Sequence, residues 1–159
     1  MNEERRQKEL EQQKTLTQKL VTFLQGDENA VRFCIDLVFL LHLWDDLIDK
    51  DTHREDNEIN DAFRVALVDI PSNPFYIAYA HHLRPLFMNV ILQWHCANKL
   101  ERGIEHEKHI AFGIRAAFIQ LFVYCAYLIG GSQWAEKVGP DIWKMYEEKM
   151  EEFIASVTI

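Results

Sequence analysis

The sequence predicts an all-α fold, a single-domain bundle of about five to six helices. Of 159 residues, 48% are hydrophobic and 12% aromatic, so the chain can bury a genuine core. It holds only six Gly and four Pro, with long stretches free of both, which favours helices over a turn-rich β fold. We expect one domain over residues 1–159, in which residues 1–12 can fray.

Charge and cysteine content restrict the class of partner and the compartment. The formal net charge is −8 and the pI is near 5.3, which argues against a protein that binds a nucleic-acid backbone. Cys34, Cys96 and Cys125 are odd in number and scattered in apolar stretches, which predicts reduced core thiols of an intracellular protein. The charged N-terminus has no apolar signal segment, so we expect a cytoplasmic location.

The first half of the chain predicts three helices. The first covers residues 2–25, is polar at its start, and ends at Gly26. Asp27 or Asn29 can cap the second helix, expected over residues 28–50. The polar connection 51–57 leads to a third helix at 58–69, and residues 70–74, which include two prolines, break the chain. The third helix has five apolar residues on one side: Ile59, Ala62, Phe63, Ala66 and Leu67.

The second half predicts longer helices. One covers 75–101, with Pro85 as a candidate kink or boundary. A break near 99–105 is expected, because an unbroken helix from 75 to 130 would span about 80 Å. The next helix, 105–130, is apolar nearly all round and its length reaches the transmembrane range, but Arg115 and Gln120 interrupt it.

That apolar helix is therefore expected to be a central buried helix or an oligomer interface, and no membrane partner is predicted. Gly130 and Gly131 end it. A short segment, 133–138, leads to Gly139-Pro140, and the last helix is expected from Asp141. Ile142, Tyr146, Phe153 and Val157 would share one face of that helix.

The best functional lead lies at the end of the second predicted helix. Asp45, Asp46 and Asp49 converge on one helical face, with His42 one turn upstream. Carboxylates this close repel one another unless a cation neutralises them, and oxygen ligands of this kind suit Mg²⁺, with Mn²⁺ as an alternative. The simpler interpretation is a solvated helix end whose opposite face carries Val38, Leu41 and Ile48.

A second acidic pair, Glu58 and Asp61, begins the third predicted helix. In an antiparallel hairpin, Asp49 would face Glu58 and Asp45 would face Asp61. Five carboxylates would then surround one space and could bind one or two divalent ions. Alternatively, Glu58 and Asp61 only complement the positive N-terminus of their helix.

Two cations lie beside these acids. Arg54 and Lys50 could contact a phosphate or simply pair with the carboxylates. A separate series, Glu101, Glu105 and His109, has the spacing of one helical face, and predicts either further metal ligands or a solvated surface.

Residues 43–54, LWDDLIDKDTHR, resemble the first aspartate-rich motif, DDxxD, of class I isoprenoid synthases. The resemblance implies that Asp45, Asp46 and Asp49 bind Mg²⁺ that holds an allylic diphosphate. It also places Arg54 where chain-elongating members often carry arginines that contact diphosphate.

The paired acidic motifs also resemble those of the all-α nucleoside triphosphate pyrophosphohydrolases, EExxE on one helix and ExxD on the next. In this resemblance Asp45, Asp46 and Asp49 stand in for the first motif, and Glu58 and Asp61 match the second. It implies a compact helical enzyme, dimeric or larger.

Chain length favours the second family. We therefore expect an Mg²⁺-dependent hydrolase of a small diphosphate-containing substrate, in a homo-oligomer. Asp45, Asp49 and Glu58 would be its catalytic carboxylates, and Arg54 and Lys50 would bind the substrate. The metal ligands would be Asp45, Asp46, Asp49, Glu58 and Asp61. The alternatives are an isoprenoid-synthase-like diphosphate-binding protein and a non-enzymatic helical interaction protein with Ile110–Ile129 as its oligomer core.

Overall fold

The computed structural model describes residues 3–50 and 52–158, which form helices, turns and loops without a strand. The predicted all-α class is confirmed. Six helices in the described part have nine or more residues: α1 (Glu3–Phe23), α2 (Glu28–Asp49), α3 (Asp56–Arg64), α5 (Pro74–Leu100), α6 (Glu105–Arg115) and α7 (Ile119–Trp143). Three shorter elements are the π-helix η1 (Val65–Asp69), α4 (Ile70–Ser72) and α8 (Met150–Ser156). Asp51, and Met1 and Asn2 of the segment expected to fray, lie outside the described residues.

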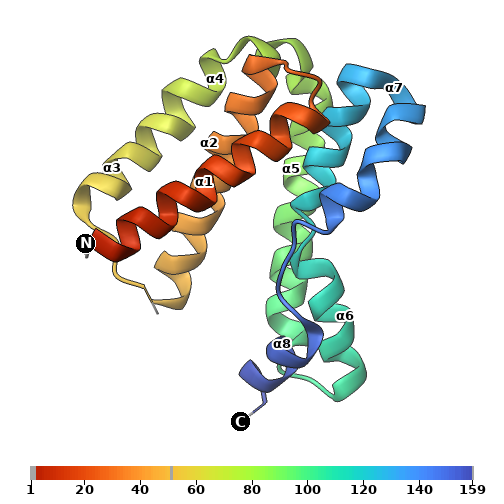
Figure 1. Cartoon of the computed structure of the whole chain (residues 1–159). Coiled ribbons are helices and arrows are strands. Elements are labelled where there is room, and N and C mark those ends of the chain that lie inside the picture. Colours follow the sequence, from red (N-terminus) through yellow and green to blue (C-terminus); the bar gives the residue numbers. More distant parts are fainter. Residues whose placement is uncertain (1–2, 51, 159) are drawn as a thin grey trace. The chain divides into compact units, whose positions relative to one another are not determined.

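The chain divides into two compact units, Met1–Ala80 and His81–Ile159. The boundary lies inside α5, so the first turns of that helix belong to the first unit and the remainder to the second (Figure 1). The division describes local packing, and the single domain over residues 1–159 stays a prediction.

The first unit begins with a helical hairpin. Leu20 and Leu24, near the end of α1, are fully buried, whereas the earlier turns of the helix are mostly exposed. Gln25 and Gly26 have positive φ angles and reverse the chain. The Ala30 backbone N–H donates to Oδ1 of Asp27 at 2.9 Å, which confirms Asp27 as the cap of α2.

The third predicted helix is longer than expected. It continues from α3 through η1 and α4 to Ser72. The predicted break at residues 70–74 is therefore wrong for Ile70–Ser72, and the helical run is interrupted at Asn73. The physical reason is the π-turn, in which the Ile70 N–H reaches back to the Val65 carbonyl and changes the helical register just before Pro71. Asn73 then ends the run: its Nδ2 donates to the Asn29 carbonyl at 2.9 Å, and its Oδ1 accepts from the Phe75 N–H at 2.8 Å.

The buried face of this run also differs from the prediction. Ala62, Val65 and Ile70 are buried, whereas Phe63 and Leu67 are exposed. The predicted stripe assumed an unbroken α-helical period, and the π-turn at Val65–Asp69 changes that period for the residues that follow it. The exposure of Phe63, which precedes the π-turn, has no such explanation.

The second unit contains residues 81–100 of α5, then α6, α7 and α8. The break predicted near residues 99–105 is confirmed, because α5 ends at Leu100 and α6 begins at Glu105. Pro85 lies inside α5 and does not end it. Phe153 of α8 is fully buried in a cluster with Ala97 and Ala111.

The last predicted helix is wrong at its start. Helix α7 continues through Gly139 and Pro140 to Trp143, and α8 begins only at Met150. Tertiary contacts account for the non-helical segment between them. Glu148 lies 3.8 Å from Arg115, and the Tyr146 ring packs against Phe112 of α6.

Helix α7 is itself a hairpin of two helical segments, as Figure 1 shows. Gly131 has φ 82° and ψ 180° at the turn, which confirms the predicted end of the apolar helix at the glycine pair. A Cβ built on Gly139 would lie 3.6 Å from Val123 Cγ1, so the two arms pack closely there.

One stretch, Glu105–Trp143, is long and apolar enough to cross a membrane by length and composition, and no second such stretch occurs in the described residues. The stretch is interrupted at residues 116–118 and at Gly131. None of its uninterrupted helical pieces reaches the roughly 20 residues that a spanning helix needs.

The cysteine prediction is partly wrong. Cys34 and Cys125 are buried free thiols as expected, but Cys96 is free and exposed. Its position explains this, because Leu92, His95 and Lys99 mark the same exposed face of α5.

Candidate ligand-binding groove

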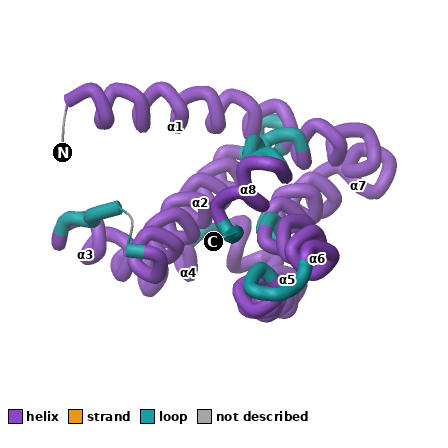
Figure 2. Tube along the Cα trace, turned by 90° about the horizontal axis from the view of Figure 1, so that it is seen from below, coloured by secondary structure: helices purple, strands orange, loops and turns teal. Residues whose placement is uncertain are grey.

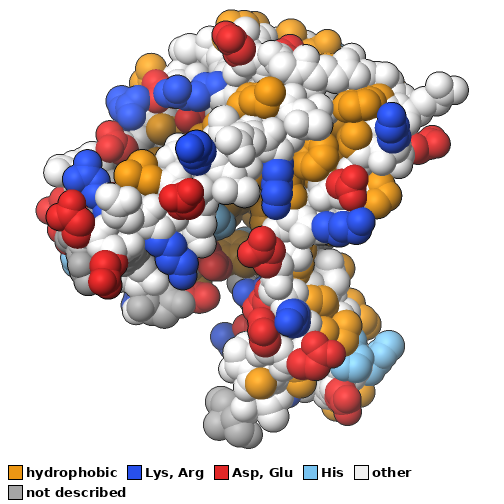
Figure 3. All heavy atoms as spheres, in the orientation of Figure 1, with side chains coloured by type: hydrophobic (Ala, Val, Ile, Leu, Met, Phe, Trp, Pro, Cys, Tyr) orange, Lys and Arg blue, Asp and Glu red, His pale blue; other side chains and the backbone are white. Residues whose placement is uncertain are grey.

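An open groove of about 750 Å³ lies within the first unit. Helix α2 forms its floor, with α1 on one side and α3 and η1 on the other; Figure 2 shows α1 and α2 separating with distance from their connecting turn. The groove is lined by polar and apolar side chains: Glu9, Gln12, Gln13, Leu16, Arg32, Ile35, Asp36, Val38, Phe39, His42, Asp45, Asp46, Thr52, Arg54, Asp61, Arg64, Val65 and Asp69. On the face of the first unit visible in Figure 3, acidic and basic side chains alternate without a continuous patch of one sign.

Arg54 joins the two predicted acidic motifs. Its Nε donates to Asp46 Oδ2 at 2.6 Å, its second terminal nitrogen also contacts Asp46, and Nη1 donates to Glu58 Oε1 at 2.8 Å. The Arg54 side chain is only 13% exposed. Burial alone would lower the pKa of Arg54, but the hydrogen bonds to Glu58 and Asp46 outweigh it and raise the pKa. The guanidinium is therefore a fixed positive charge between two carboxylates.

The five predicted metal ligands are not equivalent. Asp45, Asp46 and Asp61 line the groove, whereas Glu58 is not among the lining residues and is linked to them by its hydrogen bond with Arg54. Asp61 lies 3.4 Å from Arg64. Asp49 is exposed and is not among the lining residues.

Glu58 and Lys50 both have local roles at the ends of their helices. The other oxygen of Glu58 accepts the Glu55 backbone N–H at 2.9 Å, so this carboxylate also caps α3, as the simpler interpretation expected. Lys50 is exposed, has a left-handed backbone (φ 58°) and ends α2 through its own N–H. Its side chain does not line the groove.

Metal binding by these acids stays a prediction. Within residues 3–50 and 52–158, no group of three or more His, Cys, Asp or Glu side chains is arranged to hold a metal ion. At this site Arg54 already pairs with Asp46 and Glu58. Mg²⁺ does not require a complete protein cage, because it commonly combines one or two carboxylates with substrate phosphate and water.

His42 lines the groove one turn before Asp45 and Asp46. The residue is in part exposed to solvent, but desolvation by the surrounding protein lowers the pKa of His42. Asp46 and Asp45 act against this shift, and Arg54 reinforces it. The imidazole is therefore neutral at pH 7 and can accept a proton.

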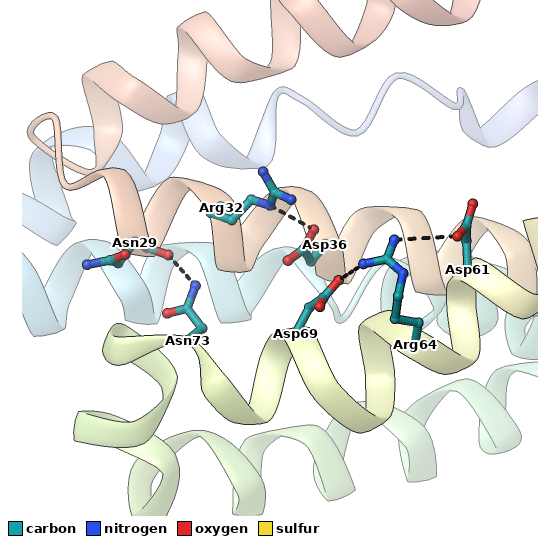
Figure 4. Close-up of polar contacts among 7 residues, drawn as sticks. All are labelled: Asn29, Arg32, Asp36, Asp61, Arg64, Asp69 and Asn73. Carbon is teal, nitrogen blue, oxygen red and sulfur yellow. Dashed lines mark hydrogen bonds and ion pairs between the residues drawn. The ribbon is translucent and has the colours of Figure 1, made fainter.

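A polar network at the opposite end of the groove was not predicted. Asp36 is 8% exposed, lies 3.3 Å from Arg32, and faces Asp69 of η1 (Figure 4). Asp69 in turn contacts Arg64, which also pairs with Asp61. Burial raises the pKa of Asp36; Arg32 opposes this shift, and the nearby Asp69 adds to it.

One sequence signal could have identified part of this network. Asp36 is the single charge within an otherwise apolar run, Phe33–Leu41, and a buried charge needs a partner. No comparable sequence signal marked Asp69, because its position depends on the π-turn, whose last residue it is. Single π-turns are frequent at functional sites.

The third predicted series does not form one helical face. Glu101 lies in the turn between α5 and α6 and pairs with Arg115 at 3.7 Å. Glu105 and His109 share α6 and lie 3.9 Å apart on its exposed surface. Arg115, noted in the sequence only as an interruption, instead connects Glu101, Glu148 and the Phe153 ring.

Comparison of the chain with family models, with curated proteins and with solved structures finds no match. The function is therefore argued from the groove itself.

Proposed function

We propose that the groove of the first unit binds a diphosphate-containing small molecule with Mg²⁺ and hydrolyses it, in the manner of a nucleotide pyrophosphohydrolase. One observation carries this proposal: Arg54 contacts both acidic motifs at one groove, through Asp46 of α2 and Glu58 of α3. An arginine beside carboxylates can bind phosphate bidentately while the carboxylates retain a metal ion.

Ligand binding would require Arg54 to exchange partners. A diphosphate offers the guanidinium a more highly charged acceptor than either carboxylate. Release of Asp46 would leave it next to Asp45 in the groove, and together these two side chains could hold Mg²⁺. The ion would supply neutralisation of the phosphoryl oxygens.

His42 gives the site a group suited to proton transfer. It lies in the same groove as Asp45 and Arg54 and is neutral at pH 7. A neutral imidazole can accept the proton of an attacking water molecule. We assign it this role beside the carboxylates that were predicted as catalytic.

Calorimetric titration tests the binding step. Wild type is titrated with inorganic pyrophosphate in the presence and absence of Mg²⁺, beside Asp46→Asn and the control Asp56→Asn, an exposed acid of α3 outside the groove lining. We expect Mg²⁺-dependent binding in wild type and the control, and a loss of at least about tenfold in affinity in Asp46→Asn. Absence of binding in wild type would overturn the proposal.

Turnover assays separate the substrate classes. Pyrophosphate release from nucleoside triphosphates supports the hydrolase, whereas turnover of prenyl diphosphates supports the isoprenoid-synthase-like alternative. Binding without turnover of either would leave a diphosphate-binding protein and contradict the hydrolase.

A second candidate is a non-enzymatic helical interaction protein. It is favoured by three large apolar side chains on α3 and η1, Phe63, Leu67 and Val68, which are 64%, 71% and 55% exposed. Large exposed apolar residues gathered on one surface commonly mark an interface. The oligomer core considered from the sequence, Ile110–Ile129, instead contains many buried residues, including Leu121 and Phe122.

Sedimentation equilibrium of wild type and Leu67→Glu tests this candidate. A dimer that dissociates in the variant, together with no effect of Mg²⁺ or pyrophosphate, would favour the interaction protein over the enzyme.

A further inference from the structure

The α1 wall of the groove carries side chains that the proposed function does not use. Glu9, Gln12, Gln13 and Leu16 line the groove from this helix. They recur at a spacing of three and four residues, so they form one stripe along α1. The stripe begins with a carboxylate, continues with two neutral amides, and ends with an apolar side chain.

The connecting turn determines what this stripe faces. Helices α1 and α2 are antiparallel neighbours, so positions equally distant from the turn lie opposite one another. Glu9 is then level with His42, and the two glutamines are level with Val38 and Phe39. All these residues line the groove.

Two properties suit this part of α1 to closing over a ligand. The helix is held by Leu20 and Leu24 near its C-terminal end, whereas Leu10 is 55% exposed. Helices α1 and α2 also separate toward the N-terminus of α1 (Figure 2), and the two glutamines and Glu9 line the groove from this part of α1. Among the residues that the structure describes, neither glutamine side chain has a hydrogen-bond partner.

We propose that the exposed half of α1 is a lid whose Gln12 and Gln13 amides donate hydrogen bonds to the phosphoryl oxygens of a ligand in the groove. This inference rests on the proposed function and adds ligand-binding residues to it. Amide donors bind an anion without adding charge, so they complement Arg54.

The test compares full-length variants by titration with inorganic pyrophosphate and Mg²⁺. Gln12→Ala/Gln13→Ala is expected to weaken binding by about tenfold, the equivalent of two ordinary hydrogen bonds. The matched control is Gln7→Ala/Gln18→Ala, which removes two exposed α1 glutamines outside the groove lining and is expected to leave the affinity within about twofold.

Hydrogen exchange of wild type provides an independent measurement. Ligand should protect amides of residues 3–15 of α1 as well as those of α2 near the groove. Alanine favours helix over glutamine, so loss of α1 itself does not explain weaker binding.

The outcomes separate the two proposals. If wild type does not bind pyrophosphate, the proposed function fails. If wild type binds, α2 is protected, and α1 and the glutamine variant are unaffected, the groove function stands and the lid is overturned.

Discussion

The Nε of Arg54 donates a 2.6 Å hydrogen bond to Oδ2 of Asp46, eight residues earlier in the chain and on the other side of the α2–α3 connection. The same guanidinium reaches Glu58 at 2.8 Å. A single side chain thereby holds the ends of two helices together and shares its positive charge between both acids. Its removal should have a measurable effect on stability as well as on ligand binding.

Arg54→Gln is expected to destabilise the protein by about 2 kcal/mol, because it leaves Asp46 and Glu58 close together without their shared cation. Urea denaturation measures the change. The control is Lys50→Gln, an exposed cation of the same connection, which should change stability by no more than about 0.5 kcal/mol. Equal effects of the two substitutions would contradict the assigned role of Arg54.

Asp36→Asn is expected to raise the urea midpoint at pH 7. Burial raises the pKa of Asp36 in the folded protein above its value in the unfolded chain, so folding disfavours the ionised form. This penalty is absent below the unfolded pKa of about 3.9, and it develops as the pH rises through the folded pKa.

The gain from Asp36→Asn should therefore shrink as the pH falls toward 3.9. Glu147→Gln, an exposed acid of the second unit, serves as the control and should show no such gain. A variant less stable than wild type at pH 7 would mean that the Arg32 pair outweighs the cost of burying the charge.

Phe153→Ala is expected to cost about 3–5 kcal/mol and to release α8, because the ring is fully buried against Ala97 and Ala111. A helix of seven residues is not stable without such packing. Hydrogen exchange of residues 150–156 would rise toward the rate of an unstructured peptide. Met150→Ala, at an exposed position of the same helix, should leave the exchange unchanged.

Two glycines give opposite predictions for the same substitution. Gly131→Ala should destabilise by about 1–3 kcal/mol, because φ 82° with ψ 180° is a conformation that only glycine adopts readily. Gly113→Ala in α6 should stabilise by about 0.5–1 kcal/mol, because its added Cβ meets nothing within 4 Å and alanine favours helix. Thermal unfolding of both variants checks the pair, and stabilisation by Gly131→Ala would contradict the observed turn.

The local features of this protein could be predicted from its sequence. The all-α class, the Asp27 cap, the break before Glu105 and the turn at Gly131 each follow from composition or from residues within a few positions of one another. These features depend on backbone propensity and capping, which act over one or two helical turns.

Only the tertiary structure decided which side chains share an environment. It paired Arg54 with Asp46 and Glu58, opposed Asp36 to Asp69 across α2 and η1, and kept Tyr146 and Glu148 out of a helix. Such pairings depend on which helix faces are buried. The position of Asp69 opposite Asp36, for example, depends on the π-turn that ends at Asp69. The acids could therefore be recognised as a group in the sequence, whereas their partners followed from packing between segments distant in the chain.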